Sequence, residues 1–204
     1  MSEFAIAIPQ SIENLQLPSP ELLNYYKDVE NRVFYIESEI DGSLLEITKE
    51  ILRINRADKD VPVEKRTPIK LMIDSPGGDV SIMWSFIKVM EMSKTPIWTI
   101  NMCCAYSAAA DILAAGHRRF AMPGTSVLVH SGSCYYGGTQ EIAESMKKFG
   151  DKLTKSVTEY FLAHTKVDPK VFKKKAPFDW YMLDDEALEM GIVDEIITNL
   201  DEIF

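Results

Sequence analysis

Two periodicities alternate along the first half of the chain. Apolar runs rich in β-branched and aromatic side chains at residues 31–37, 69–73 and 97–102 predict buried strands. Between these runs, residues 43–55 carry apolar side chains at helical spacing, and a further helix is expected at residues 79–92. Because strands and helices take turns in this order, we expect an α/β fold in which helices cover the faces of a sheet.

The alternation continues in the second half and includes one long helix. We expect a short helix at residues 108–115 and a pair of strands at residues 119–122 and 126–130, joined by a Pro-Gly turn. Over residues 139–165, apolar side chains recur at steps of mostly three and four and predict an amphipathic helix. Its roughly 25 residues would span about 40 Å, more than a compact domain needs to cover its own sheet. Such a projecting helix predicts an oligomer in which copies of the helix pair, the alternative being a helix that lies along the domain.

The two ends of the chain differ in character. Residues 1–20 contain three prolines among polar residues and predict an irregular N-terminal arm, in which only residues 4–8 favour a short strand. At the other end, residues 178–183 and 191–197 predict strand-like segments on either side of a short helix. We therefore expect one domain over residues 21–204, preceded by the arm.

The composition is that of an ordinary soluble protein. Of the 204 residues, 46% are hydrophobic and 26% are charged, and the formal net charge is −9. This excess of negative charge argues against nucleic acid or an anionic membrane surface as a partner, because both need a concentrated cationic surface. No apolar run approaches the length of a membrane span, and the start of the chain lacks the basic region of a signal peptide. We therefore expect a cytoplasmic protein without nucleic-acid or membrane partners.

The three cysteines, Cys103, Cys104 and Cys134, are odd in number and have no CxxC spacing. Neither a disulfide framework nor a zinc site is indicated by this pattern. We expect reduced, small, buried side chains and no metal ion.

Ser107 is the first candidate for chemistry, because it is a polar residue among alanines where a strand is expected to turn into a helix. At this position its hydroxyl and the next backbone N–H groups lie at the positive end of the helix dipole, where negative charge is favoured. A nucleophile and half of an oxyanion hole could share this corner. The alternative is an N-cap serine that satisfies unpaired N–H groups of the helix.

A second corner follows the strand at residues 69–73, where residues 74–78, DSPGG, lead into a helix. The two glycines can adopt backbone angles that other residues avoid, and they let N–H groups approach a ligand closely. This corner is a second candidate source of oxyanion donors. A tight turn required only for packing is the alternative.

Two further side chains complete a hypothesis of nucleophilic catalysis. His130 stands at the exit of a strand, where functional groups gather in such sheets, which favours it over His117 in a basic turn and His164 at a helix end. Asp179 has aromatic and apolar neighbours and therefore requires a partner. We assign Ser107 as nucleophile, His130 as general base and then acid, and Asp179 as the group that orients the imidazole and stabilises its cation.

Several segments occur in an order and spacing that are far more specific than any one motif. They are IDSPGG at residues 73–78, AYS at 105–107, ILAAG at 112–116, RFAMP at 119–123, VH at 129–130, AHT at 163–165, Asp179, EA at 186–187 and GIVD at 191–194. Over about residues 22–198, the chain thereby resembles the family of Clp protease proteolytic subunits, ClpP. The resemblance implies a ClpP/crotonase-type α/β fold, a βα superhelical core with a projecting helical handle at about residues 139–165.

For the reaction, the resemblance implies a serine endopeptidase with the family's nucleophile at Ser107, its base at His130 and its acid at Asp179. The backbone N–H groups of Gly78 and Ala108 would be the oxyanion donors. The substrate would be an unfolded polypeptide, held as an added strand beside Gly78 and the segment after His130 and cleaved through an acyl-enzyme.

For assembly, the resemblance implies a homo-oligomer of two stacked heptameric rings that enclose the active sites and are fed by a hexameric AAA+ unfoldase. The unfoldase consumes ATP, whereas this subunit would need no metal or cofactor. Four positions of the family's apical unfoldase pocket stay apolar, namely Met72, Met92, Phe120 and Ile197. Lys70 stands where an aromatic residue is typical, which predicts that the usual partner binds differently or not at all.

Around Ser107 the sequence departs from the family pattern. Tyr106 replaces the usual alanine and is expected to narrow the site or change the cleavage preference. Alanines at residues 108–110 replace a usual methionine and glycine pair. Cys103 and Cys104 replace a glycine and a polar residue, which introduces rival nucleophiles, but we expect the strand to bury both.

Two alternatives remain for the function. One is a ring component that has lost activity and serves assembly or regulation, against which the presence of all three candidate side chains argues. The other is a crotonase-like acyl-CoA enzyme with the same fold and glycine turn, which would leave Ser107, His130 and Asp179 without a common purpose.

Overall fold

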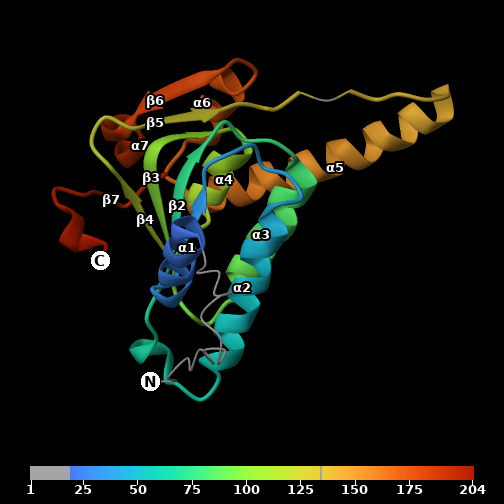
Figure 1. The fold of residues 1–204 in the computed structure, drawn as a ribbon. Helices are drawn as coiled ribbons and strands as arrows, with labels where there is room; N and C mark the ends of the chain where they lie inside the picture. The colour runs from blue at the N-terminus through green and yellow to red at the C-terminus, as the bar shows by residue number, and fades with distance from the viewer. Residues whose placement is uncertain (1–18, 134) are drawn as a thin grey trace, which may run out of the picture.

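The computed structural model describes residues 19–133 and 135–204 (Figure 1). Most of the expected N-terminal arm, including the strand expected at residues 4–8, lies outside the described residues, as does Cys134. Within the described part of the chain, no helix is long and apolar enough to cross a membrane.

Among the described residues, seven strands form one sheet. They are β1 (Val33–Ile36), β2 (Ile69–Ser75), β3 (Ile97–Tyr106), β4 (Arg118–Ala121), β5 (Ser126–Val129), β6 (Trp180–Leu183) and β7 (Glu195–Ile196). Their order from one edge is β1-β2-β3-β4-β7, with β5 beside the later part of β3 and β6 beside β5. Neighbouring strands run parallel except β5 and β6, which are antiparallel. Each strand expected from the sequence after the arm is present.

β3 is longer than expected and changes its outer neighbour along its length. Residues 98–101 of β3 pair with β4, whereas residues 104–106 pair with β5. The expectation that β4 and β5 pair with each other is therefore wrong. Both strands run parallel to β3, so they point in the same direction and share its edge one after the other instead of forming a hairpin.

A bulge in β3 lies where this change of neighbour occurs. β2 advances from Ile73 to Ser75 while β3 advances from Asn101 to Ala105, so β3 carries two extra residues. Extra residues of this kind bend a strand and re-aim its side chains, and they are common next to functional sites. The bulge directly precedes the residues that lead into Ser107.

Helices cover the sheet, and one of them projects beyond it (Figure 1). The α-helices of the described chain are α1 (Pro20–Glu30), α2 (Leu44–Ala57), α3 (Val80–Met92), α4 (Ala108–Ala114), α5 (Gln140–His164), α6 (Pro169–Lys175) and α7 (Asp184–Glu189). α2 and α3 pack side by side, and α5, the long helix expected at residues 139–165, extends past the edge of the sheet (Figure 1). α1 and α6 have no counterpart among the expected helices, although each begins with a proline after a capping side chain, Ser19 or Asp168.

The main core lies between the sheet and the helices that cover it. Ile69, Leu71 and Ile73 of β2 and Met83 and Ile87 of α3 are completely buried. β2 is covered on both faces, since six of its seven residues are buried. The glycine turn therefore follows a strand that is packed on both faces.

Candidate active site

Ser107 connects β3 to α4 in a strained backbone conformation, with φ 55° and ψ −124°. Residues other than glycine rarely adopt a positive φ, and such strain gathers at functional sites. The Ser107 side chain makes no capping hydrogen bond to the N–H groups of α4. The interpretation as a capping serine therefore does not hold, and the hydroxyl is available for another partner.

The pairing of β5 with β3 places His130 beside Ser107. The two strands are parallel, and the Ser107 N–H group donates a hydrogen bond to the Leu128 carbonyl oxygen at 2.9 Å. His130 follows two residues later, directly after the last residue of β5. Its Nε2 atom lies 2.7 Å from the Ser107 hydroxyl oxygen.

The pairing of β5 with β6 places Asp179 beside His130. Val129 and Trp180 lie opposite each other in the antiparallel ladder, so His130 and Asp179 are the next residues outward. The Nδ1 atom of His130 lies 3.0 Å from the Asp179 Oδ1 atom. A neutral imidazole with its proton on Nδ1 donates to Asp179 and leaves Nε2 to accept the hydroxyl proton of Ser107. The structure thus brings all three sequence-predicted side chains into one hydrogen-bonded chain.

The glycine turn after β2 packs directly against the Ser107 corner. A Cβ atom at Gly77, where φ is 94°, would lie 2.5 Å from the Tyr106 carbonyl oxygen and 2.8 Å from the Ser107 Cβ atom. A Cβ atom at Gly78 would overlap with the carbonyl oxygen of Ile40. Because these contacts are too short for any side chain, only glycine fits at the two positions.

Two backbone N–H groups at these corners donate no hydrogen bond within the described residues. They belong to Gly78 and to Ala108, the first residue of α4. The two corners touch, since a Cβ atom at Gly77 would lie 3.1 Å from the Ala108 nitrogen. Free N–H groups beside a nucleophile are suited to stabilising a developing oxyanion.

A narrow cavity of about 60 Å³ opens beside Ser107 and His130. Its walls come from α4, α5, α6 and the end of β5, and most of them are apolar. Ala108 and Ala110 line the cavity, and their small side chains leave this space open.

The same cavity contains the carboxyl group of Asp111 in α4. Within the described residues this carboxyl takes part in no hydrogen bond and no ion pair, and burial raises the pKa of Asp111 to about 8. Asp111 is not among the site residues expected from the sequence. The available signal was an acidic residue four positions after Ser107, inside an otherwise apolar helix.

Cys103 is exposed and Cys104 is half-buried, so the expectation that the strand buries both is wrong. The cause is the bulge in β3, which lifts these residues out of the regular pairing with β2 and β4. Burial, followed by the hydrogen bond from its thiol to Asp74 (3.2 Å), raises the pKa of Cys104 to about 12, so this thiol is a poor nucleophile. Asp74, Cys103 and Cys104 offer donor atoms within 4.8 Å of one another, which makes them the group in the described chain that could hold a metal ion.

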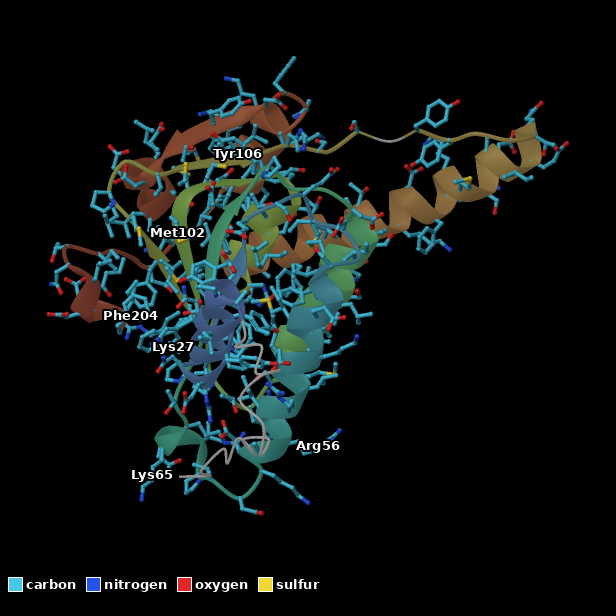
Figure 2. The ribbon with its side chains drawn as sticks, in the orientation of Figure 1. Lys27, Arg56, Lys65, Met102, Tyr106 and Phe204 are labelled. Carbon is cyan, nitrogen blue, oxygen red and sulfur yellow. The ribbon has the colours of Figure 1, made fainter. Side chains whose placement is uncertain are left out.

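Tyr106 is not among the residues that line the cavity beside Ser107, so it does not narrow this cavity. Whether Tyr106 changes the cleavage preference stays a prediction. Its hydroxyl lies 2.8 Å from the Ser126 hydroxyl oxygen, and its ring packs edge-on against Tyr181 with centroids 5.6 Å apart. Tyr106 therefore joins the end of β3 to β5 and β6 (Figure 2).

The other two histidines have structural partners. His117 accepts a hydrogen bond at Nδ1 from the Ile97 N–H group at 3.0 Å. His164 donates from Nδ1 to the Tyr160 carbonyl oxygen at 2.8 Å and stacks on the Tyr160 ring. These contacts agree with the preference for His130.

Three of the four positions expected in a partner pocket pack into a small second core. These buried residues are Met72, Phe120 and Ile197. Met92 lies outside this cluster, with 73% of its surface exposed. Lys70 is also buried, and its Nζ atom lies 4.9 Å from the ring centre of Phe204. Burial lowers the pKa of Lys70.

Comparison with known proteins relates the chain to one family. The family model described as Clp protease matches residues 22–200. ATP-dependent Clp protease proteolytic subunit 2 of Thermobifida fusca is 29% identical over 178 residues, which cover 84% of this chain and 83% of the relative. The ATP-dependent Clp protease proteolytic subunit of Deinococcus radiodurans is 24% identical over 198 residues, covering 96% and 94%. The parallel sheet and its covering helices agree with the fold expected for this family.

Replacing Asp111 with asparagine is expected to stabilise the fold in a pH-dependent way. Because the pKa of Asp111 is raised to about 8 in the folded chain, ionisation of this carboxyl favours unfolding. The cost is absent below the unfolded-state pKa of about 4, grows as the pH rises, and levels off above the folded-state pKa. We expect Asp111→Asn to gain roughly 2 kcal/mol at pH 8 and less at pH 5, because the half-buried side chain keeps part of its hydration and the cost of ionisation is therefore only partial.

Urea unfolding at the two pH values measures this difference. Asp60→Asn, which changes an exposed carboxyl in the loop after α2, is the matched control and should leave stability unchanged at both. A gain for Asp111→Asn that is equal at pH 5 and pH 8 would show that the Asp111 carboxyl carries no such cost.

Proposed function

We propose that this chain, which belongs to the Clp protease family, is a serine endopeptidase subunit that cleaves unfolded polypeptides. The observation that carries the proposal is the unbroken chain of contacts from the Ser107 hydroxyl through the His130 imidazole to Asp179, at 2.7 and 3.0 Å. A nucleophile, a base and an orienting acid at such distances are what acyl transfer from a peptide bond requires.

In the proposed acylation step, the Ser107 oxygen attacks the carbonyl carbon of the scissile bond while its proton passes to His130 Nε2. The Asp179 carboxylate stabilises the imidazolium that forms. The carbonyl oxygen becomes an oxyanion and accepts hydrogen bonds from the N–H groups of Gly78 and Ala108. His130 then donates its proton to the leaving amine, and the acyl group remains on Ser107.

In the proposed second step, a water molecule attacks the acyl carbon while His130 accepts its proton. The bond to Ser107 breaks, the serine oxygen regains a proton from His130, and a carboxylic acid leaves. Because His130 handles each proton, the reaction needs no metal or cofactor in this subunit. An extended substrate would lie as an added strand beside Gly78 and the segment after His130.

The two alternatives have less support. A ring component without activity would not need a serine held at a positive φ with a glycine turn pressed against it. A crotonase-like acyl-CoA enzyme would have no use for the contact between His130 and Asp179.

We further propose that the subunit works inside a closed assembly. Ile142, Met146 and Phe149 follow one another at steps of four and three on the projecting half of α5 and are 52%, 45% and 64% exposed. This uncovered apolar stripe fits pairing with the same helix of another copy. The relatives are named ATP-dependent proteolytic subunits, which supports an ATP-consuming partner. As the family resemblance implies, this partner would be an AAA+ unfoldase that supplies substrate to two stacked heptameric rings in the cytoplasm.

A fluorophosphonate or β-lactone probe is expected to modify Ser107, because His130 activates its hydroxyl. Ser107→Ala and His130→Ala should abolish labelling and lower peptide hydrolysis by about 10⁴-fold or more. Mass spectrometry of the labelled peptide locates the modified residue. Ser85→Ala, which changes an exposed serine of α3, is the matched control and should keep full labelling. Labelling of Cys103 or Cys104 in place of Ser107 would contradict the assignment.

Gly77→Ala is expected to lower kcat by roughly 10²-fold while the protein stays folded, because the new Cβ atom displaces the turn from the Ser107 corner. Gly124→Ala is the matched control. Gly124 also has a positive φ, but a Cβ atom there would meet nothing within 4 Å. Peptide hydrolysis and thermal unfolding of both variants make the comparison. Parent-like turnover by Gly77→Ala would rule out a role of this turn in the reaction.

Sedimentation velocity tests the proposed assembly. The parent should sediment as a large oligomer, and the double variant Ile142→Lys, Phe149→Lys as a smaller species, because two charges are then placed in an apolar contact. Glu144→Lys makes the same change of net charge on the opposite side of α5 and should leave the oligomer intact. A parent protein that sediments as a monomer would refute the proposed pairing of α5.

A further inference from the structure

The cavity beside the nucleophile is built around one unpaired carboxyl. Asp111 follows Ser107 by four residues, one turn of α4 away, or about 6 Å along the helix axis. Both residues line the same cavity. A substrate residue whose carbonyl carbon bonds to Ser107 would therefore direct its side chain toward Asp111.

The walls of this cavity suit a long, unbranched side chain. Val129, Val157, Phe161 and Phe172 contribute apolar surface from β5, α5 and α6. The cavity is small, with a volume of about 60 Å³, and its apolar walls can contact the aliphatic stem of such a side chain. A side chain that is apolar along its length and polar at its end suits this cavity. Its stem would contact the apolar walls, and its end would meet the Asp111 carboxyl.

No cation of the described chain occupies the position opposite Asp111. Lys88 of α3 lies over the ring of Tyr160, which neighbours Asp111, but it forms an ion pair with Glu91 at 2.6 Å. Arg119 is held by Asp194 and donates to the Gly191 carbonyl oxygen. His130 is engaged by Ser107 and Asp179. Lys88 and Arg119 thus have partners, as does the imidazole of His130, whereas the Asp111 carboxyl has none among the described residues.

Asp111 is half-buried, and its carboxyl has no partner within the described residues. Ionisation of this carboxyl destabilises the folded chain, because the charge gives up part of its hydration without gaining a counter-charge. Residues that cost stability in this way are typical of functional sites, where a ligand supplies what the protein lacks. A cation brought in by the substrate would favour the ionised carboxyl and pair with it. The loss of stability caused by the ionised Asp111 carboxyl is then offset only when a suitable substrate is bound.

We propose that the Asp111 carboxylate binds the cationic end of a lysine or arginine side chain of the substrate, so that cleavage occurs on the carboxyl side of basic residues. This inference rests on the proposed function, because it assigns the substrate side chain that the Ser107 site accepts. It makes Asp111 a specificity-determining residue, separate from the groups that carry out the reaction.

Peptide substrates that differ only at the residue before the scissile bond provide the first test. The four residues are lysine, arginine, norleucine and glutamine, each followed by a fluorogenic amine. Norleucine has the aliphatic stem of lysine without its charge. For the parent protein we expect kcat/KM for lysine or arginine to exceed that for norleucine by roughly 10- to 100-fold, the range of a charged hydrogen bond.

Variants at Asp111 locate the source of the preference. Asp111→Asn and Asp111→Ala should remove the advantage of the basic peptides, so that the ratio of kcat/KM for the lysine peptide to that for the norleucine peptide falls to about one, whatever the absolute rate of each variant. Asp60→Asn should keep the parent preference, since this exposed carboxyl lies in the loop after α2. A parent protein that cleaves the norleucine peptide as fast as the lysine peptide would overturn the inference. So would a preference for glutamine, which would show Asp111 acting as a neutral hydrogen-bonding group.

Labelling rates separate failure of this inference from failure of the proposed function. Diphenyl phosphonates that carry a lysine-like or a norleucine-like side chain should label Ser107 at rates that differ at least tenfold in favour of the cation. Equal rates would reject the role of Asp111 and leave the serine peptidase standing. Absence of labelling at Ser107 by both phosphonates and by a small uncharged fluorophosphonate would reject the proposed function itself.

Discussion

The pairing of β5 with both β3 and β6 is the interaction on which the rest of the site depends. This one short strand holds the Ser107 corner on one side through the Leu128 carbonyl and faces the start of β6 on the other. His130 directly follows the strand, between the two side chains it must contact. Because a slip of one residue turns each side chain of a strand to the opposite face, the main-chain ladder sets the geometry of the side chains. Tyr106 reinforces this ladder through its contact with Ser126.

The backbone around Ser107 is strained, and the core beneath it supplies the support. Ser107 adopts a positive φ, and the turn at Gly77 and Gly78 lies so close that no side chain fits between the two corners. Such an arrangement persists only where the surrounding structure over-determines it. Here the support comes from β2, whose side chains are buried on both faces and which leads directly into the turn. Both unpaired N–H groups are thereby fixed in advance of any ligand.

Two features destabilise the isolated chain and find a purpose only with partners. The Asp111 carboxyl lies in an apolar cavity without a counter-charge in the described chain, and the projecting half of α5 leaves an apolar stripe in water. Exchange to more compatible residues, one at Asp111 and three along the stripe, could remove these features without harm to the fold. Each feature lacks a binding partner: the Asp111 carboxyl lacks a cation, and the stripe on α5 lacks an apolar surface. A peptidase that binds substrate inside an assembly of its own copies would fill both.

The sequence by itself determined the order of strands and helices, the two corners and the residue types of the site. Ser107, His130 and Asp179 could be selected because each stands at the end of an expected strand or turn, and local periodicity reports where elements end. The tertiary structure alone decided which strands pair, so β4 and β5 were wrongly expected to pair with each other, and Cys103 was wrongly expected to be buried because a bulge is a property of two strands together. It also decided that Asp111 faces a cavity, since the walls come from helices far apart in the chain. The spacing of apolar residues shows which face of a helix or strand is buried. Strand register and cavities depend instead on the elements that pack against that face, which local spacing does not report.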